Sequence, residues 1–219
     1  MSENMNVTRR TLLQASAAGA CTLALGGIAA SGAQAHAQET AQVPDGAGVQ
    51  YGFLVGLSRC SGCGRCVEAC RKHNKLSEDT PDRRSVSSYR RSRGREFFVS
   101  TSCMHCAEPS CMSVCPAGAI SKDSSGVVRV DAGLCIGCKY CYQACPYEVP
   151  RYNSVSMDKC DCCLGSGVPL DEDPYCVRAC KFGALRFGPL QELMDSTNGS
   201  AVPIAQANDP SCLLLGTEK

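Results

Sequence analysis

Short apolar stretches alternate with polar turns along residues 49–190. Apolar and β-branched runs that are bounded by turn residues predict strands. The expected strands cover residues 49–57, 96–100 and 184–187, and a hairpin is expected from residues 117–120 and 127–131 around a Ser/Asp/Gly turn. The expected short helices cover residues 67–74, 139–144 and 177–179. This order predicts an α+β fold of small, loop-rich units.

The cysteine content adds chemistry to this picture. The sequence has 19 cysteines, three histidines and no tryptophan, and its formal net charge is +1. Such a content indicates either a disulfide scaffold or a thiolate-metal protein. The near-zero charge and the 5% aromatic content argue against a nucleic-acid partner. No uninterrupted run of ~18 apolar residues offers a membrane span.

Residues 1–37 have the order of an export signal. Arg9 and Arg10 precede an Ala/Gly/Leu-rich stretch, which ends in a small-x-small cleavage site at residues 35–37. We interpret the segment as a cleaved twin-arginine signal peptide; a Sec signal with two arginines is the alternative, and lipidation of Cys21 stays open. The twin-arginine route carries folded proteins, so we expect the periplasm or the extracytoplasmic face of the membrane.

Sixteen cysteines form four groups. Group one is Cys60, Cys63, Cys66 and Cys70; group two is Cys103, Cys106, Cys111 and Cys115; group three is Cys135, Cys138, Cys141 and Cys145; group four is Cys160, Cys163, Cys176 and Cys180. Groups one and three have the spacing of bacterial ferredoxins, in which three thiolates hold one cubane and the fourth binds its neighbour. A disulfide scaffold would require bonds between residues three apart, which ring strain disfavours. Zinc sites would show paired CxxC knuckles, not triple runs with a fourth cysteine behind them. The spacing therefore predicts iron-sulfur clusters with these cysteines as metal ligands.

The sequence around the groups resembles a known family. The phrases that carry the resemblance are SCMHCAEPSCMSVCPAGAI, GLCIGCKYCYQACPYEVPRY and the CDCC that opens group four. They are similar to the four-cluster electron-transfer subunits of the dimethyl-sulfoxide-reductase family, which accompany molybdopterin oxidoreductases. The resemblance covers about residues 49–190. A twin-arginine signal on this subunit resembles the nitrite-reductase and tetrathionate-reductase versions.

The resemblance implies a fold and a set of ligands. It implies two nested ferredoxin-like dicluster units around four [4Fe-4S] clusters. The outer unit would comprise residues 49–95, with an Arg-rich insertion, and 151–190, the inner unit 96–150, and a C-terminal tail 191–219. The implied ligand sets are Cys60, Cys63 and Cys66 with Cys180; Cys160, Cys163 and Cys176 with Cys70; Cys103, Cys106 and Cys111 with Cys145; and Cys135, Cys138 and Cys141 with Cys115. Some relatives have Trp at the position of Cys138 and hold a three-iron cluster, whereas cysteine here favours four [4Fe-4S] clusters.

Several residues near the groups keep alternatives open. Cys163 preserves the x2 spacing of group four, and Cys162 is its alternative as the ligand. His105 is expected to tune hydrogen bonding or to pack rather than to bind iron. The arginines of residues 83–95 form a solvated insertion, a docking surface or a counterweight to the negative charge of the clusters. Cys212 is expected to pack as a small hydrophobic residue.

The expected function is electron transfer without substrate turnover, because no acid-base pair or activated nucleophile is evident. We expect a relay between a molybdopterin-containing catalytic subunit and a membrane anchor, a cytochrome or another redox partner. The alternatives are a freestanding periplasmic polyferredoxin shuttle and a subunit of another oxidoreductase, such as a hydrogenase or nitrite reductase system. The apolar content is low without the cysteines, so the metal-free protein is expected not to fold.

Overall fold

The computed structural model describes residues 48–90, 94 and 96–216. The protein divides into Met1–Gln42 and Val43–Lys219, and all described residues belong to the second unit. The predicted signal peptide and Cys21 lie outside the described residues, as do Arg91, Arg93 and Arg95. The described part is α+β, as predicted from the sequence.

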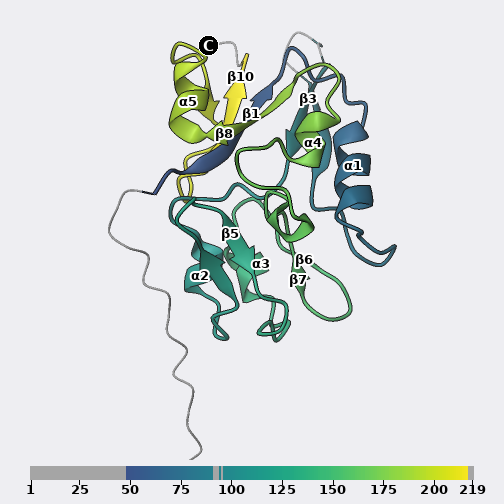
Figure 1. Ribbon diagram of the computed structural model, residues 1–219, viewed down its shortest axis with the longest axis vertical. Coiled ribbons are helices and arrows are strands. Elements are labelled where there is room, and N and C mark those ends of the chain that lie inside the picture. The colour runs from purple at the N-terminus through teal and green to yellow at the C-terminus, as the bar shows by residue number, and fades with distance from the viewer. Residues whose placement is uncertain (1–47, 91–93, 95, 217–219) are drawn as a thin grey trace, which may run out of the picture. The chain divides into compact units, whose positions relative to one another are not determined.

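Figure 1 shows a four-stranded sheet. Its order is β8 (Leu185–Pro189), β1 (Tyr51–Gly56), β10 (Cys212–Leu215) and β9 (Val202–Pro203). Strands β1, β8 and β10 contribute Phe53, Val55, Leu185 and Cys212 to the main core. Strand β1 pairs antiparallel with β8 and parallel with β10, with Phe53 opposite both Phe187 and Cys212. Strand β10 therefore makes residues 212–215 of the predicted C-terminal tail part of this sheet.

The two faces of this sheet are covered differently. Phe53 and Val55 of β1 pack into the main core, which also contains ligand-group cysteines. Leu54 points to the opposite face and packs with Leu193 of helix α5 (Leu190–Asp195) and with Leu213. Alternate residues of a strand face opposite sides, so β1 is buried on both faces and has a continuous apolar run.

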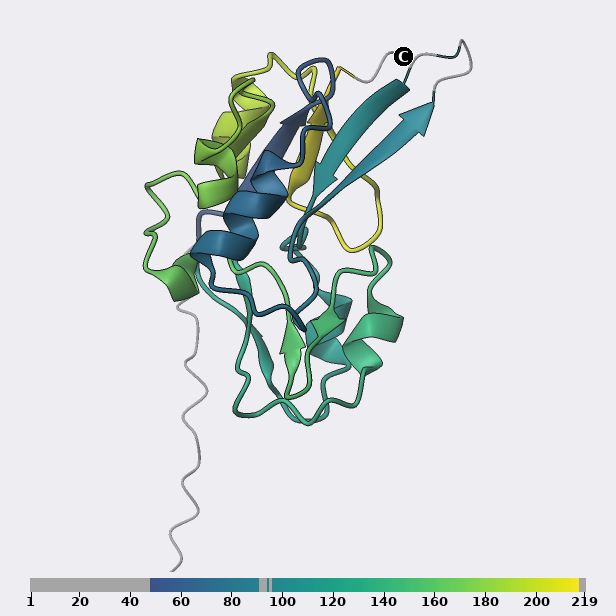
Figure 2. The ribbon, with the colours of Figure 1, turned by 90° about the vertical axis from the view of Figure 1, so that its right-hand side faces the viewer.

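A hairpin of β2 (Ser85–Arg90) and β3 (Glu96–Thr101) packs beside this sheet and extends from it (Figure 2). Strand β3 was predicted from its apolar residues, and Val99 belongs to the main core. Strand β2 was not predicted, because four of its six residues are Ser or Arg and four are exposed. The predicted unit boundary at residue 96 falls between the two strands, and the domain boundaries stay a prediction.

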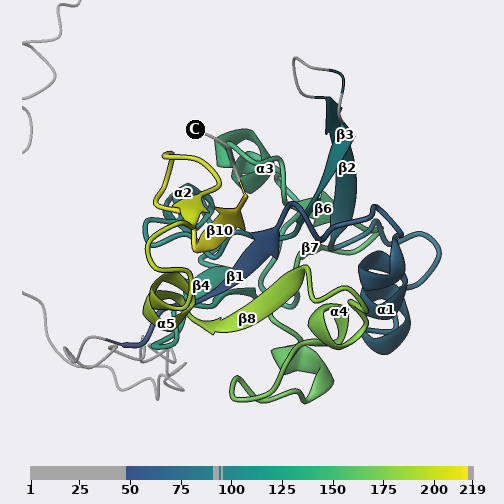
Figure 3. The same cartoon turned by 90° about the horizontal axis from the view of Figure 1, so that it is seen from above.

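Four short helices form two contacting pairs. Helix α1 (Arg65–His73) lies beside α4 (Tyr175–Arg178), as Figures 1 and 3 both show. Helix α2 (Ser110–Ser113) contacts α3 (Tyr140–Ala144). Around the second pair lie two ribbons, β4 (Ile120–Lys122) with β5 (Val128–Val130) and β6 (Arg151–Tyr152) with β7 (Met157–Asp158). A 3-10 turn at Leu164–Ser166 follows the CDCC sequence.

Candidate metal centres

The cysteine loops turn through backbone conformations that favour glycine. Gly62 of group one has φ 74° and Gly137, at the matching position of group three, has φ 67°. A left-handed residue between two ligands reverses the backbone direction, so that successive cysteines can face one point. A Cβ atom on Gly62 would lie 2.6 Å from the ring of Phe98, whereas one on Gly137 would meet no atom within 4 Å. The β2–β3 hairpin thus packs closely against the loop that carries the cysteines of group one.

The structure brings the sixteen cysteines together in four sites, each of which takes three cysteines from one group and one from another. Site 1 contains Cys60, Cys63, Cys66 and Cys180; site 2 contains Cys70, Cys160, Cys163 and Cys176; site 3 contains Cys103, Cys106, Cys111 and Cys145; site 4 contains Cys115, Cys135, Cys138 and Cys141. These combinations are the ones that the resemblance implied.

Sites 1, 3 and 4 each surround a cavity. All four cysteines of each of these sites line its cavity. Site 2 is assigned from the closeness of its cysteines. The Nδ2 atom of Asn74 lies 3.7 Å from the sulfurs of both Cys70 and Cys163. The thiols of Cys160 and Cys163 also act electrostatically on Cys176.

Helices α1 to α4 each connect two sites. Helix α1 contains Cys66 of site 1 and Cys70 of site 2. Helix α4 contains Cys176 of site 2, and Cys180 of site 1 follows it. The pair α2 and α3 repeats this arrangement: Cys111 of site 3 is followed by Cys115 of site 4, and Cys141 of site 4 by Cys145 of site 3. The helix pairs therefore join site 1 to site 2 and site 3 to site 4.

The donor atoms fit iron-sulfur clusters. All described cysteines are free thiols. The pKa of the Cys106 thiol is raised to about 12, and the pKa values of the Cys111 and Cys176 thiols are raised to about 11. Burial is the main cause, and neighbouring thiols add to the increase. A bound metal centre would stabilise such closely gathered thiols as thiolates. Thiolate-only sites favour zinc or iron-sulfur clusters, and the crossed pairing of the groups is typical of the latter.

Hydrogen-bond donors also reach ligand sulfurs. The Ala184 amide lies 3.3 Å from Cys180 Sγ, and the Met157 amide lies 3.4 Å from Cys135 Sγ. Tyr152 Oη lies 2.9 Å from Cys141 Sγ. Donors of this kind stabilise a thiolate and raise the reduction potential of a cluster that it holds. Sequence reasoning did not find Tyr152, because its approach to Cys141 depends on the β6–β7 ribbon.

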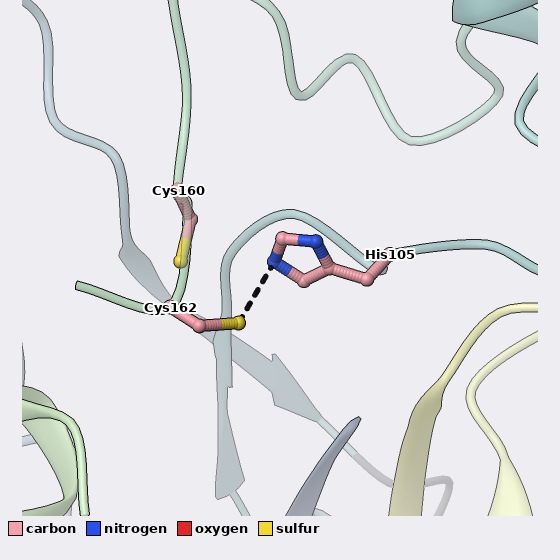
Figure 4. Close-up of side chains that lie close together, drawn as sticks. All are labelled: His105, Cys160 and Cys162. Atoms are coloured by element: carbon pink, nitrogen blue, oxygen red, sulfur yellow. Dashed lines mark hydrogen bonds between the residues drawn. The ribbon is translucent and has the colours of Figure 1, made fainter. Parts of the chain in front are cut away.

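The side chain of Cys162 points toward His105 (Figure 4). Its sulfur lies 3.3 Å from His105 Nε2, while the Val128 amide donates to Nδ1 over 3.1 Å. With Nδ1 accepting this bond, the proton belongs on Nε2, which can donate to Cys162. The ligand atoms of His105, Cys160 and Cys162 lie within 4.8 Å of one another. The geometry favours Cys163 as the fourth cysteine of site 2 and a packing and hydrogen-bonding role for His105.

The arginine-rich stretch is not one solvated surface. Arg83 donates through Nε and Nη2 to both carboxylate oxygens of Asp158, at 2.8 Å each, and lies 3.4 Å from Asp161. Arg84 is buried, whereas Arg90 is exposed at the end of β2. The expectation of a solvated insertion is therefore wrong for Arg83 and Arg84.

Two buried cations lie among the sites, Arg84 and Lys159. Burial would lower the pKa of each, but nearby thiolates raise it overall: Cys176, Cys160, Cys66 and Cys70 for Arg84, and Cys103, Cys160 and Cys111 for Lys159. In the sequence, Arg84 is marked by the arginine run and Lys159 by its position before Cys160, but neither signal indicates burial.

Among the described residues, no helix has the length and apolar character needed to cross a membrane.

Comparisons with known proteins identify the family. Residues 59–119 and residues 95–190 each match the family described as "4Fe-4S dicluster domain". The sequence is 41% identical over 157 residues to the B subunit of anaerobic dimethyl sulfoxide reductase of Escherichia coli, a match that covers 66% of this protein and 76% of the relative. It is 38% identical over 171 residues to the corresponding subunit of Haemophilus influenzae (71% and 82%) and 39% identical over 151 residues to Protein NrfC of Escherichia coli (66% and 68%). The sequence-based identification is thus confirmed, and the protein belongs to the 4Fe-4S dicluster family and, within it, to the iron-sulfur electron-transfer subunits of the dimethyl sulfoxide reductase type.

Proposed function

We propose that sites 1 to 4 each hold one [4Fe-4S] cluster and that the protein relays electrons through them. Four free cysteines meet at each site, and three of the sites surround a cavity. When bound, such clusters take up and release single electrons. The protein's own residues fix the distances between the sites and supply hydrogen bonds and charges that set the potentials.

The observation that carries this proposal is the linear order of the sites. Helices α1 and α4 join sites 1 and 2, and helices α2 and α3 join sites 3 and 4. Sites 2 and 3 approach each other at Lys159, whose Nζ lies 3.4 Å from Cys103 Sγ and 3.1 Å from the carbonyl oxygen of Cys160. Cys63 of site 1 and Cys138 of site 4 are the two exposed cysteines among the described residues. Electrons can therefore enter and leave at the two ends of the series.

The proposed partners are a molybdopterin-containing catalytic subunit and a membrane anchor, cytochrome or other redox protein. Two relatives are named as parts of anaerobic dimethyl sulfoxide reductase, which supports a catalytic partner of that type. Phe182 beside site 1 is 55% exposed, and Ile136 and Tyr140 beside site 4 are 69% and 60% exposed. Exposed apolar side chains at both terminal sites support docking to two partners better than a freestanding shuttle.

We further propose that the protein works in the periplasm or on the extracytoplasmic face of the membrane, and that it does not itself transform the substrate. The order of residues 1–37 supports export by the twin-arginine route. Replacing Arg9 and Arg10 by lysine should leave the protein in the cytoplasm in a cell fractionation experiment. Unchanged export would contradict the proposed route.

Purification of the native complex tests the proposed function. A tag on this subunit should recover a larger subunit, and elemental analysis should find molybdenum together with iron. A monodisperse single polypeptide that contains reducible clusters but no molybdenum partner would favour the polyferredoxin shuttle. Zinc in place of iron would contradict both functions.

A further inference from the structure

Two cations are buried between the cysteine sites. Arg84 is 2% exposed and Lys159 is 4% exposed, and they are the only buried lysine or arginine side chains among residues 48–90, 94 and 96–216. Within these same residues, neither forms an ion pair with a carboxylate. An isolated buried charge is strongly unfavourable, so each cation requires negative charge from another source.

Lys159 lies where site 2 meets site 3. Its Nζ is 3.4 Å from Cys103 Sγ of site 3 and donates over 3.1 Å to the carbonyl oxygen of Cys160, a member of site 2. The carbonyl oxygen of Val128 accepts a further hydrogen bond from Nζ. These contacts use the three donors of an ammonium group, and one of them is to a ligand sulfur.

Arg84 lies where site 1 meets site 2. It donates to Ser100 Oγ over 3.1 Å and to Ser102 Oγ over 2.9 Å, and its guanidinium carbon lies 4.7 Å from the centre of the Phe53 ring. Ser100 Oγ is in turn 3.3 Å from Cys66 Sγ of site 1. Arg84 also acts through space on Cys176, a member of site 2.

The charges of the sites explain why these cations can be buried. A cubane held by four thiolates has a net negative charge, and reduction adds one more electron. A fixed positive charge nearby stabilises the reduced form more than the oxidised form and so raises the potential. No buried lysine or arginine lies at site 4 in the part of the protein that the structure describes.

We propose that Arg84 and Lys159 are potential-setting residues of the relay: Arg84 raises the reduction potentials of the clusters in sites 1 and 2, and Lys159 raises those in sites 2 and 3. This inference rests on the proposed function, because it requires a cluster in each site. Site 2 is influenced by both cations and site 4 by neither. Lys159 also places positive charge at the junction between the two helix pairs, where an electron passes from one pair of sites to the other.

The test is a redox titration followed by electron paramagnetic resonance on the loaded full-length protein, with dithionite and ferricyanide as reductant and oxidant. K159M should lower two of the four potentials, each by a tenfold or larger change in the reduction equilibrium, about 59 mV for one electron. R84M should also lower two. One cluster should respond to both substitutions and one to neither, a pattern that needs no earlier assignment of signals to sites. The charge-preserving controls K159R and R84K should shift the potentials much less.

Iron content separates the possible failures. If K159M or R84M does not load four clusters, K159Q and R84Q, which retain hydrogen-bond donors without the charge, replace them in the same titration. Four intact clusters with unchanged potentials in the charge-removing variants would overturn the inference and leave the proposed function standing. A wild-type protein without reversible clusters would overturn the proposed function itself.

Discussion

The hydroxyl oxygen of Tyr152 lies 2.9 Å from the sulfur of Cys141, so the β6–β7 ribbon delivers a hydrogen-bond donor to site 4. Burial and the neighbouring Cys141 raise the pKa of Tyr152, so the hydroxyl keeps its proton and can donate to a thiolate. This pair shows how a residue outside the cysteine groups can influence a cluster.

Replacing Tyr152 by phenylalanine should lower the potential of one cluster. The variant removes a charge-assisted hydrogen bond worth ~1.5 kcal/mol. If the bond forms only in the reduced state, its loss lowers the potential of a one-electron couple by ~60 mV. If the bond is also present in the oxidised state, the potential falls by less. A redox titration monitored by electron paramagnetic resonance measures the shift. Tyr140→Phe is the matched control, because Tyr140 is exposed. Equal potentials in the Y152F variant and the wild type would contradict a role for this hydroxyl.

Cys162 and Cys163 should behave differently when each is replaced by alanine. The Cys163 sulfur lies within reach of the same Asn74 amide as the sulfur of Cys70, whereas the Cys162 sulfur faces His105. We expect C162A to retain the iron content and the full set of cluster signals, and C163A to lose one cluster. The reverse outcome would assign Cys162 as the ligand.

Gly62 and Gly137 provide a matched pair for testing how the β2–β3 hairpin packs on the loop of group one. Both have positive φ, so alanine introduces backbone strain of ~1 kcal/mol at either position. Only at Gly62 does the new methyl group collide with Phe98, and overpacking adds ~1–3 kcal/mol. G62A should therefore lose its cluster absorbance at a lower temperature than G137A. Equal thermal profiles would show that the hairpin does not press on this loop.

Elements with local signals could be predicted from the sequence. Strands β1, β3 and β8 were found because apolar residues run through them, and the cysteine spacing identified the groups. Strand β10 was missed because its place depends on pairing with β1, which lies about 160 residues earlier in the sequence. The burial of Arg84 and Lys159 was also inaccessible, because it arises only when separate groups assemble around them.

Removing the iron should unfold the part of the protein that the structure describes. Ligand cysteines such as Cys66, Cys103, Cys160 and Cys176 belong to the main core, so the aliphatic residues alone enclose little apolar volume. Burial raises the pKa of the Cys106 thiol to about 12, so this thiol binds a proton firmly as soon as its bond to iron breaks. Protons then compete with iron, and the competition strengthens as the pH falls. Chelation should be faster at pH 6 than at pH 8, and circular dichroism should show loss of structure; a cooperative thermal transition in iron-free protein would contradict this prediction.

The central claim is that the sixteen cysteines hold four clusters that carry electrons in series. A quantitative redox titration of the loaded wild-type protein, followed by electron paramagnetic resonance and paired with iron and acid-labile sulfide analysis, tests it most directly. We expect four reversible one-electron transitions, with magnetic interaction between neighbouring reduced clusters. Fewer than four reversible transitions in fully loaded protein, or four clusters without such interaction, would contradict the claim.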